Sequence, residues 1–226
     1  MAGTAWNDDP TGSAKVIETN SRALLASLAA DTTKRSRPGI ALAHRWHKAL
    51  FHGVAVPSPS YLGNPRDSDP LHPDLIDYEV AVGAKQGLPA VHVPAALTAF
   101  QAAIRSAVKA YDETFAPGVA PTGGEDVLAI VELAAVAHGE WVRIHPYANG
   151  NGRVARVWAN WIALRYGLPP FIRVRPRPAG LIYARAAMAS MGAPPQFTGD
   201  HGPTVAAFVD LLHGAPLPLG EYENDR

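Results

Sequence analysis

Apolar residues recur at intervals of three and four along most of the chain, in segments separated by Pro- and Gly-rich breaks. This spacing places apolar side chains on one face of an α-helix. It predicts helices over residues 13–30, 40–53, 94–114, 125–144, 152–166, 181–191 and 203–212. We therefore expect a mainly α-helical protein.

Two segments break this pattern. Residues 54–73 are rich in Pro, Ser and Asp and predict a long loop, which inside a compact domain is usually functional or mobile. Apolar and other side chains alternate over residues 78–82, a glycine-containing turn follows at 83–87, and apolar residues return at 91–93. This alternation predicts a β-hairpin across residues 77–93.

The helix predicted at residues 125–144 is strongly apolar and is expected to be the core helix. Trp141, Trp158 and Trp161 are expected in the core beside it. Ser13 precedes the first apolar residues of the first helix and is the expected N-cap, since a Ser side chain can accept from the free N–H groups there.

Composition excludes several classes of protein. The chain has 226 residues, enough for one domain with a small appendage, and carries 20 basic and 20 acidic residues. This balance argues against a general nucleic-acid or membrane-surface binder. Without any cysteine, disulfides, thiolate metal sites and a cysteine nucleophile are excluded.

The chain shows no targeting or membrane segment. Its first ten residues are polar and acidic, without the apolar core of a signal peptide, and no apolar run approaches the ~18 residues of a membrane span. We expect a cytoplasmic location. The preference for Arg over Lys, with many Ala, Gly and Pro residues, hints at a GC-rich bacterial genome.

The candidate chemistry lies between two apolar helices, at residues 145–156. Gly150 and Gly152 permit positive φ and close approach of a ligand to the backbone. The loop leads into a helix N-terminus, where free N–H groups and the helix dipole favour phosphate. Arg153 and Arg156 lie in the first turn, where the dipole disfavours cations, so their presence indicates an anionic partner.

The other side chains of this loop suit the same use. His145 ionises near neutrality and is a candidate base for an attacking hydroxyl, while Asn151 can donate to a phosphate or fix the loop. A purely structural interpretation is a capping histidine followed by a tight Asn-Gly turn. The joint pattern favours a phosphate site, although neither the P-loop nor the dinucleotide-binding fingerprint is present.

The segment His-Pro-Tyr-Ala-Asn-Gly-Asn-Gly-Arg-Val-Ala-Arg at 145–156 closely resembles the signature of the Fic family, His-Pro-Phe-x-Asp/Glu-Gly-Asn-Gly-Arg-x-x-Arg. The resemblance extends over about residues 40–190. It implies a helical Fic core, with the hairpin acting as a flap that holds a target segment by strand addition.

The resemblance also implies an activity: transfer of AMP from ATP to a hydroxyl of a target protein, with release of pyrophosphate. By likeness, His145 deprotonates the acceptor, and Gly150, Asn151 and Gly152 form the anion hole. Arg153 would bind the β- and γ-phosphates, and Arg156 would support the γ-phosphate or the loop. Positioning and charge stabilisation dominate such phosphoryl-type chemistry.

Two positions depart from the family signature. Tyr147 stands where the family has Phe, which is a mild change if its hydroxyl finds a partner. Asn149 stands where the family has a carboxylate that ligates Mg²⁺ between the α- and β-phosphates. An amide oxygen is a weaker ligand for a hard cation, so Asn149 holds Mg²⁺ weakly, or metal use is reduced, or the donor differs from ATP.

The N-terminal helix resembles the inhibitory helix of many Fic proteins, whose motif is Ser/Thr-x-x-x-Glu-Gly/Asn. Glu18 would be the inhibitory residue and would pair with Arg156. Ala14 and Thr19 depart from the motif, and the alternative is a solvated helix carboxylate. We expect an N-terminal segment at 1–36, a Fic-like catalytic domain at 37–215 and a polar tail at 216–226.

Further candidates have ordinary explanations. His44, His47 and His52 lack the accompanying ligands of a zinc site and are expected to be surface or partly buried residues. Residues 173, 175 and 177 are arginines that form a solvated edge or touch a nucleotide or acidic target.

Three functions remain open from the sequence. The first is a transferase that modifies a protein hydroxyl. The second is a tailoring transferase for a small molecule, with residues 54–73 as a lid over a closed pocket. The third is a degenerate regulatory or toxin-like module, which the change at Asn149 favours and the intact His145, Arg153 and Arg156 oppose.

Overall fold

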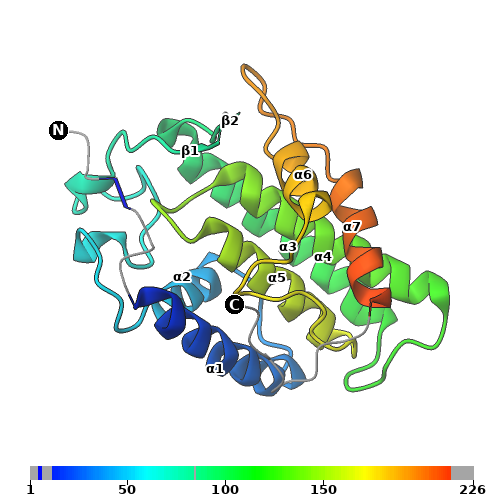
Figure 1. Ribbon diagram of the computed structural model, residues 1–226. Helices are drawn as coiled ribbons and strands as arrows, with labels where there is room; N and C mark the ends of the chain where they lie inside the picture. Colours follow the sequence, from blue (N-terminus) through cyan, green and yellow to red (C-terminus); the bar gives the residue numbers. More distant parts are fainter. Residues whose placement is uncertain (1–4, 7–11, 84, 215–226) are drawn as a thin grey trace.

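The computed structural model describes residues 5–6, 12–83 and 85–214 of the chain (Figure 1). Within these residues it contains seven α-helices, three short 3-10 turns and one two-stranded antiparallel hairpin. The helices are α1 (Ser13–Thr33), α2 (Ile40–Leu50), α3 (Val93–Thr114), α4 (Gly124–Ile144), α5 (Asn151–Arg165), α6 (Leu181–Ser190) and α7 (Gly202–His213). The predicted mainly α fold is confirmed.

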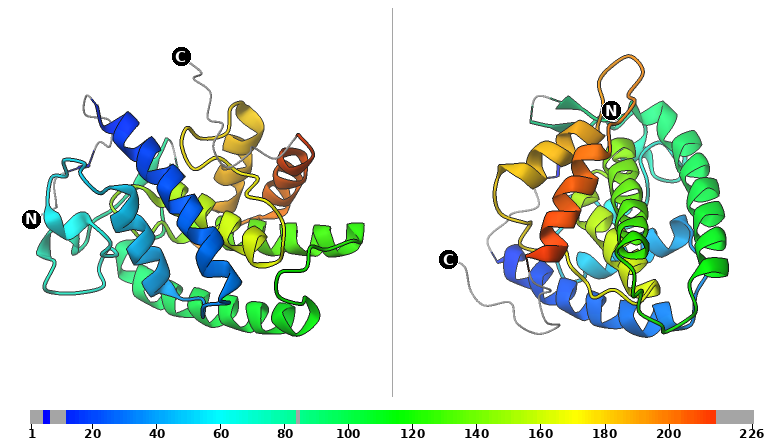
Figure 2. Two further views of the ribbon diagram at one scale, coloured as in Figure 1. Left: turned by 90° about the horizontal axis from the view of Figure 1, so that it is seen from below. Right: turned by 90° about the vertical axis from the view of Figure 1, so that its right-hand side faces the viewer.

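Helices α4 and α5 form the centre of the molecule. α5 packs against α4, α1 and α2, and α4 also packs against α3, α6 and α7. In the right-hand view of Figure 2, α3 lies on one side of α4, and α6 and α7 lie on the other. As expected, Trp141, Trp158 and Trp161 are fully buried between these elements.

Helix α5 is buried on nearly every face, so its polar side chains need partners inside the protein. Asn160 finds such partners in the segment that follows the helix. Its Oδ1 accepts the N–H groups of Phe171 and Ile172, and its Nδ2 donates to the carbonyl of Ile172 at 2.7 Å. These bonds hold the segment that follows α5 against the helix, and so place Val174 beside the first turn of α5.

The hairpin is shorter than predicted. β1 (Ala81–Val82) pairs with β2 (Lys85–Gln86) in the register Ala81↔Gln86 and Val82↔Lys85. The prediction that residues 91–93 form its second strand is wrong, because they belong to the 3-10 turn η3 (Ala90–His92) and the start of α3. Pro89 lacks an N–H to continue the ladder and ends it.

The helix ends also differ from expectation. α1 continues to Thr33, and α2 ends at Leu50. Ser13 is the first helical residue and not the cap, because Gly12 takes the N-cap position with φ 91°. The loop at 54–73 contains the 3-10 turn η1 (Pro59–Tyr61), and η2 (Pro73–Leu75) begins at its end.

The predicted domain division stays a prediction. α1 packs on α2 and α5 and shares their core, and the polar tail at 216–226 lies outside the described residues. Within the described residues, every helix is too short or too polar to cross a membrane.

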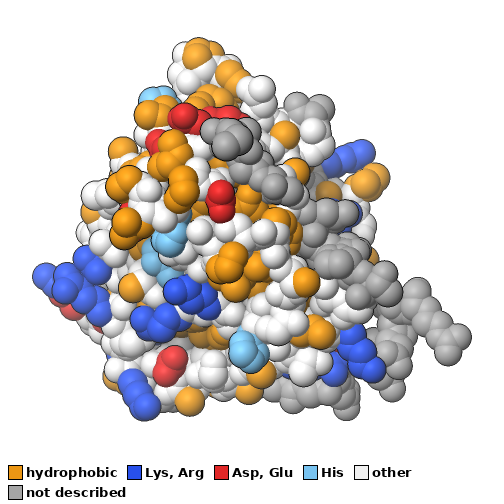
Figure 3. Space-filling view, turned by 90° about the vertical axis from the view of Figure 1, so that its left-hand side faces the viewer, with side chains coloured by type: hydrophobic (Ala, Val, Ile, Leu, Met, Phe, Trp, Pro, Cys, Tyr) orange, Lys and Arg blue, Asp and Glu red, His pale blue; other side chains and the backbone are white. Residues whose placement is uncertain are grey.

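The surface carries mixed charge. On the face drawn in Figure 3, Lys and Arg side chains form several small groups, with acidic, histidine and hydrophobic side chains between them. This distribution agrees with the equal numbers of basic and acidic residues in the sequence.

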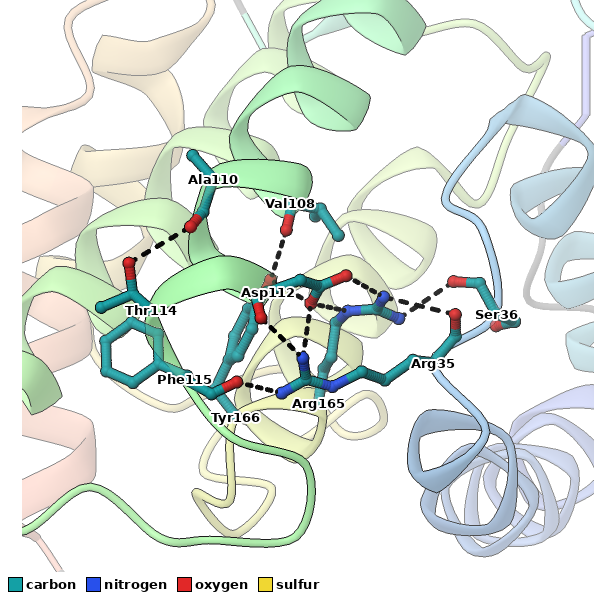
Figure 4. A network of polar contacts seen from close by, with 9 residues as sticks. All are labelled: Arg35, Ser36, Val108, Ala110, Asp112, Thr114, Phe115, Arg165 and Tyr166. Atoms are coloured by element: carbon teal, nitrogen blue, oxygen red, sulfur yellow. Dashed lines mark hydrogen bonds and ion pairs between the residues drawn. The ribbon is translucent and has the colours of Figure 1, made fainter.

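One carboxylate joins three elements at the far end of α5 (Figure 4). Asp112 on α3 accepts from Arg165 Nε at 3.0 Å and from its terminal nitrogen at 2.6 Å. Tyr166 also donates to Asp112 at 3.2 Å, and Arg35 lies 3.5 Å from the same carboxylate. Because the Arg165 side chain is almost fully buried, loss of Asp112 would leave a buried cation unpaired.

We therefore expect Asp112→Asn to lower the free energy of unfolding by about 2–3 kcal/mol in urea denaturation. Glu113→Gln is the matched control, because Glu113 is an exposed carboxylate on the same helix, and it should change the value by less than about 0.5 kcal/mol. Equal losses in the two variants would contradict this role of Asp112.

Candidate active site

The site begins where α4 ends. His145 follows Ile144 with φ 50° and ψ 55°, a left-handed conformation that is uncommon for a residue with a side chain. Such a conformation persists only where the surrounding structure fixes it, and it occurs often at functional sites. Here the fixing group is Arg66, whose Nε donates to the carbonyl of His145 at 2.9 Å.

Arg66 is a buried residue of the long loop at 54–73. Its other guanidinium nitrogens donate to the carbonyls of Tyr78, Leu88 and Ile144. Burial lowers the pKa of Arg66 to about 10, so the group remains charged at neutral pH. Arg66 thus joins the long loop, both sides of the hairpin and the end of α4.

Arg66 was not predicted from the sequence. A single arginine in a Pro- and Ser-rich loop has no periodicity, and its four carbonyl partners come from distant parts of the chain. Only the three-dimensional structure shows that Arg66 fixes the long loop at 54–73 to the rest of the protein.

The His145 ring has a defined protonation. Its Nδ1 lies 2.9 Å from the carbonyl oxygen of Val142, which can only accept, so Nδ1 carries the proton. Nε2 therefore holds the lone pair. Burial lowers the pKa of His145 to about 4, with a smaller contribution from Arg66 in the same direction. The ring is neutral at pH 7, and its Nε2 lone pair can accept a proton.

The loop after His145 is closed by its own side chains. Asn151 accepts from the N–H of Tyr147 and donates to the carbonyl of Tyr147, both at 2.8 Å. Of the two roles expected for Asn151, its side chain takes the one that fixes the loop. Gly150 has φ 82°, and a Cβ there would lie 2.5 Å from the Phe51 ring, so only glycine fits.

Two histidines of α2 support the loop. His44 Nδ1 lies 2.9 Å from the Tyr147 hydroxyl, which gives the Phe-to-Tyr change its polar partner. His47 Nε2 lies 3.0 Å from the carbonyl of Asn149, and its Nδ1 accepts from the N–H of Gly63. Burial lowers the pKa of His47 to about 3, so it supports the loop as a neutral ring.

His44 and His47 are thus half-buried and buried supports, and His52 is exposed. Within the described residues, no group of three or more His, Asp or Glu side chains is arranged to bind a metal.

The first turn of α5 presents backbone donors. The N–H groups of Arg153 and Val154 bond to the carbonyl of Gly150. The N–H groups of Asn151 and Gly152 precede the first intrahelical bond, and no protein acceptor within the described residues takes them. Together with the helix dipole, these two N–H groups are suited to bind an anion.

Asn149 lies two residues before the first of these donors. Its Oδ1 accepts from the N–H of Gly150 at 2.5 Å and from Arg153 at 3.0 Å, and its Nδ2 donates to the carbonyl of Trp6 at 2.8 Å. Trp6 was not identified from the sequence. Since both lone pairs of the amide oxygen are in use beside a guanidinium, Asn149 does not fit a Mg²⁺ ligand.

Arg153 and Arg156 are both buried but contact different groups. The Arg153 guanidinium lies 4.7 Å above the Phe51 ring. Arg156 donates through Nε and a terminal nitrogen to the carbonyl of Val174, and through the other to the Tyr183 hydroxyl at 3.0 Å. Arg156 thereby ties α5 to the segment after it and to α6.

These groups line one cavity of about 840 Å³, a volume in the usual range for small-molecule sites. Among the described residues that line it, five are arginines and one is acidic. The cavity contains every residue of the predicted site, which comprises Glu18, His145, Asn149, Gly150, Asn151, Gly152, Arg153 and Arg156. It also contains the three alternating arginines, at positions 173, 175 and 177.

Glu18 lines this cavity from α1, but it does not make the expected contact. Its carboxylate pairs with Arg22 one turn later on the same helix, at 2.5 Å. Within the described residues, no ion pair joins Glu18 to Arg156, because the Arg156 guanidinium is directed to Val174 and Tyr183. The predicted pairing is therefore wrong for this structure.

The mainly helical fold thus brings the N-terminus of α5 and the neutral ring of His145 to one arginine-lined cavity. The model of the Fic/DOC family matches residues 40–163, more than half of the chain. The chain therefore belongs to the Fic/DOC family.

Curated relatives match over a short segment. The chain is 47% identical over 47 residues to the protein adenylyltransferase Fic of Nematostella vectensis, which is 21% of this chain and 11% of that protein. It is 44% identical over 45 residues to a uridine 5'-monophosphate transferase of Xanthomonas campestris, which is 20% of this chain and 8% of that protein. The matched segment thus spans about a tenth of these relatives.

The fold has a solved counterpart. A crystal structure of BepC, a VirB-translocated effector protein from Bartonella tribocorum with bound AMPPNP, aligns with a TM-score of 0.55 over 92% of each chain. Because the two sequences are only 15% identical, this likeness supports the fold alone.

The lowered pKa of His145 can be measured directly. We expect its Cε1–H signal, identified by its loss in His145→Gln, to titrate in proton NMR with a midpoint near pH 4. The shift lies below the ordinary value of about 6.5 because burial favours the neutral ring. A midpoint at or above about 6.5 would contradict the buried, neutral state.

Proposed function

We propose that this protein is a nucleotidyltransferase that moves AMP, or a related phosphate-containing group, from a nucleotide to a hydroxyl of a target protein. The observation that carries the proposal is one arginine-lined cavity that contains the neutral ring of His145 and the N–H groups of Asn151 and Gly152, which bond to no acceptor in the described part of the chain. These groups supply a base and an anion site within one cavity.

In the proposed step, the acceptor oxygen attacks the α-phosphorus of the nucleotide. The bond from that phosphorus to the pyrophosphate oxygen breaks, and the hydroxyl proton moves to Nε2 of His145. The backbone donors of α5 and the charges of Arg153 and Arg156 stabilise the phosphate oxygens. The products are the modified hydroxyl and pyrophosphate.

A protein acceptor is favoured by a second, smaller hollow. It has a volume of about 350 Å³ and is lined by residues of the hairpin and its flanks, including Glu79, Gln86 and Pro89. A groove along a strand suits an extended peptide, since backbone groups of a hairpin can bond to a further strand. The hairpin is joined to α6 by Lys85, whose ammonium donates to the carbonyls of Met188 and Gly192.

The names of the curated relatives suggest which nucleotide donors to compare. Curated relatives are named adenylyltransferases, and one is named a uridine 5'-monophosphate transferase, so ATP and UTP are the first donors to compare. We propose ATP, since adenylyltransferase names occur repeatedly among these relatives.

Incubation with nucleotides labelled at the α-phosphate tests this function. We expect label on protein in a lysate, and His145→Ala to lower the rate by at least about 10²-fold because the base is lost. His52→Ala is the matched control, since that exposed side chain follows α2 and does not line the cavity, and it should transfer like the wild type.

Label on a small acceptor would instead favour a tailoring transferase, and no transfer from any nucleotide would favour a non-catalytic module. Transfer by His145→Ala as fast as by the wild type would overturn the assignment of the base.

Glu18 is proposed as an inhibitory residue of the same cavity. A carboxylate among the arginines repels phosphate and offsets part of the positive charge of the cavity. This effect does not need a direct pair between Glu18 and Arg156. We expect Glu18→Gln to raise the rate of transfer severalfold. Asp31→Asn is the control, because it removes an exposed carboxylate from the same helix; a Glu18→Gln rate no higher than wild type would contradict inhibition.

A further inference from the structure

The amide of Asn149 has one orientation that satisfies its surroundings. Two N–H donors, from Gly150 and Arg153, point at one of its terminal atoms, and the carbonyl of Trp6 faces the other. The reverse orientation would oppose the amide NH₂ to both donors and its oxygen to the carbonyl. The oxygen therefore faces the anion-binding loop, with both lone pairs occupied.

This contact set explains why the residue is an amide. A carboxylate at 149 would accept from Gly150 and Arg153 equally well, but its second oxygen would lie against the carbonyl of Trp6. Trp6 itself is held in place: its ring is buried and packs on Phe51 at 4.6 Å and on Tyr61 at 6.0 Å. Asn149 thus connects the segment at Trp6 to the loop that binds the anion.

The same contacts disfavour a divalent cation at this position. Mg²⁺ binds oxygen at about 2.0–2.1 Å and needs a free lone pair. A cation on the Asn149 oxygen would displace the bonds from Gly150 and Arg153 and would lie close to the Arg153 guanidinium, which repels it. Glu18 is the one acidic side chain among the described lining residues, and its carboxylate is paired with Arg22.

Positive charge for a polyphosphate is already present in the protein. The cavity is lined by arginines from two elements: Arg153 and Arg156 from α5, and those at 173, 175 and 177 from the segment that follows it. Guanidinium groups match phosphate oxygens with paired donors and remain charged at any pH of interest. Mg²⁺ on the nucleotide would cancel part of the negative charge that these arginines attract.

We propose that the site binds its nucleotide as the metal-free polyanion, with arginine charge in place of a divalent cation and with Asn149 as a positioning residue. This inference rests on the proposed function and concerns the form of its donor. It assigns Asn149 the task of orienting the Gly150 N–H and Arg153, and no task in holding metal.

Calorimetric titration of the whole protein with ATP, once in EDTA and once in excess Mg²⁺, tests the proposal. For the wild type we expect a dissociation constant that is smaller in EDTA by about threefold or more, because free ATP carries more negative charge. In Asn149→Asp the dissociation constant in Mg²⁺ should fall relative to that in EDTA, since a carboxylate is a better ligand for a hard cation than an amide oxygen. Circular dichroism melting checks that this variant is folded.

Tighter binding by the wild type in Mg²⁺ than in EDTA would overturn the proposal while leaving the proposed function intact. No binding in either buffer would overturn both. A second measurement does not depend on the variant: water-proton relaxation of Mn²⁺ with saturating ATP should show no further enhancement when wild-type protein is added. An enhancement from a protein-bound Mn²⁺–ATP complex would overturn the metal-free form.

Discussion

The site depends on a buried cation in a loop. The guanidinium of Arg66 donates to four carbonyls, those of Tyr78, Leu88, Ile144 and His145. One charge thus holds four separate backbone positions close together. Such a charge is tolerated inside a protein only when its donors are satisfied, so these backbone positions are fixed together. The left-handed turn at His145, which orients the proposed base, is one of them.

The site depends also on helix α5, whose first turn faces the cavity and whose remainder is buried. Helix α5 brings the N–H groups of Asn151 and Gly152, the proposed anion donors, to the cavity, while Asn160 holds the following segment beside the helix. In that segment the carbonyl of Val174 accepts hydrogen bonds from Arg156, and three further arginines of the segment line the cavity. The contacts that pack this segment against α5 therefore also place the arginine charges in the cavity.

The sequence predicted what local periodicity and local chemistry can express. The seven helices and the glycine requirement at Gly150 were visible in short stretches, and so was the loop that brings His145 and the start of α5 to one cavity. The strand at 91–93 was predicted wrongly, because alternation over three residues does not distinguish a strand from the turn that Pro89 begins. Arg66, Trp6 and the Arg22 partner of Glu18 were missed or misassigned, since their contacts depend on tertiary placement.

The central claim is that the loop from His145 to Arg156 holds the phosphates of a nucleotide. A crystal structure of the protein with a non-hydrolysable ATP analogue tests it most directly. The account predicts phosphate oxygens within about 3 Å of the N–H groups of Asn151 and Gly152, with the α-phosphate facing Nε2 of His145. Phosphates bound at another part of the chain, with these N–H groups facing only solvent, would contradict it.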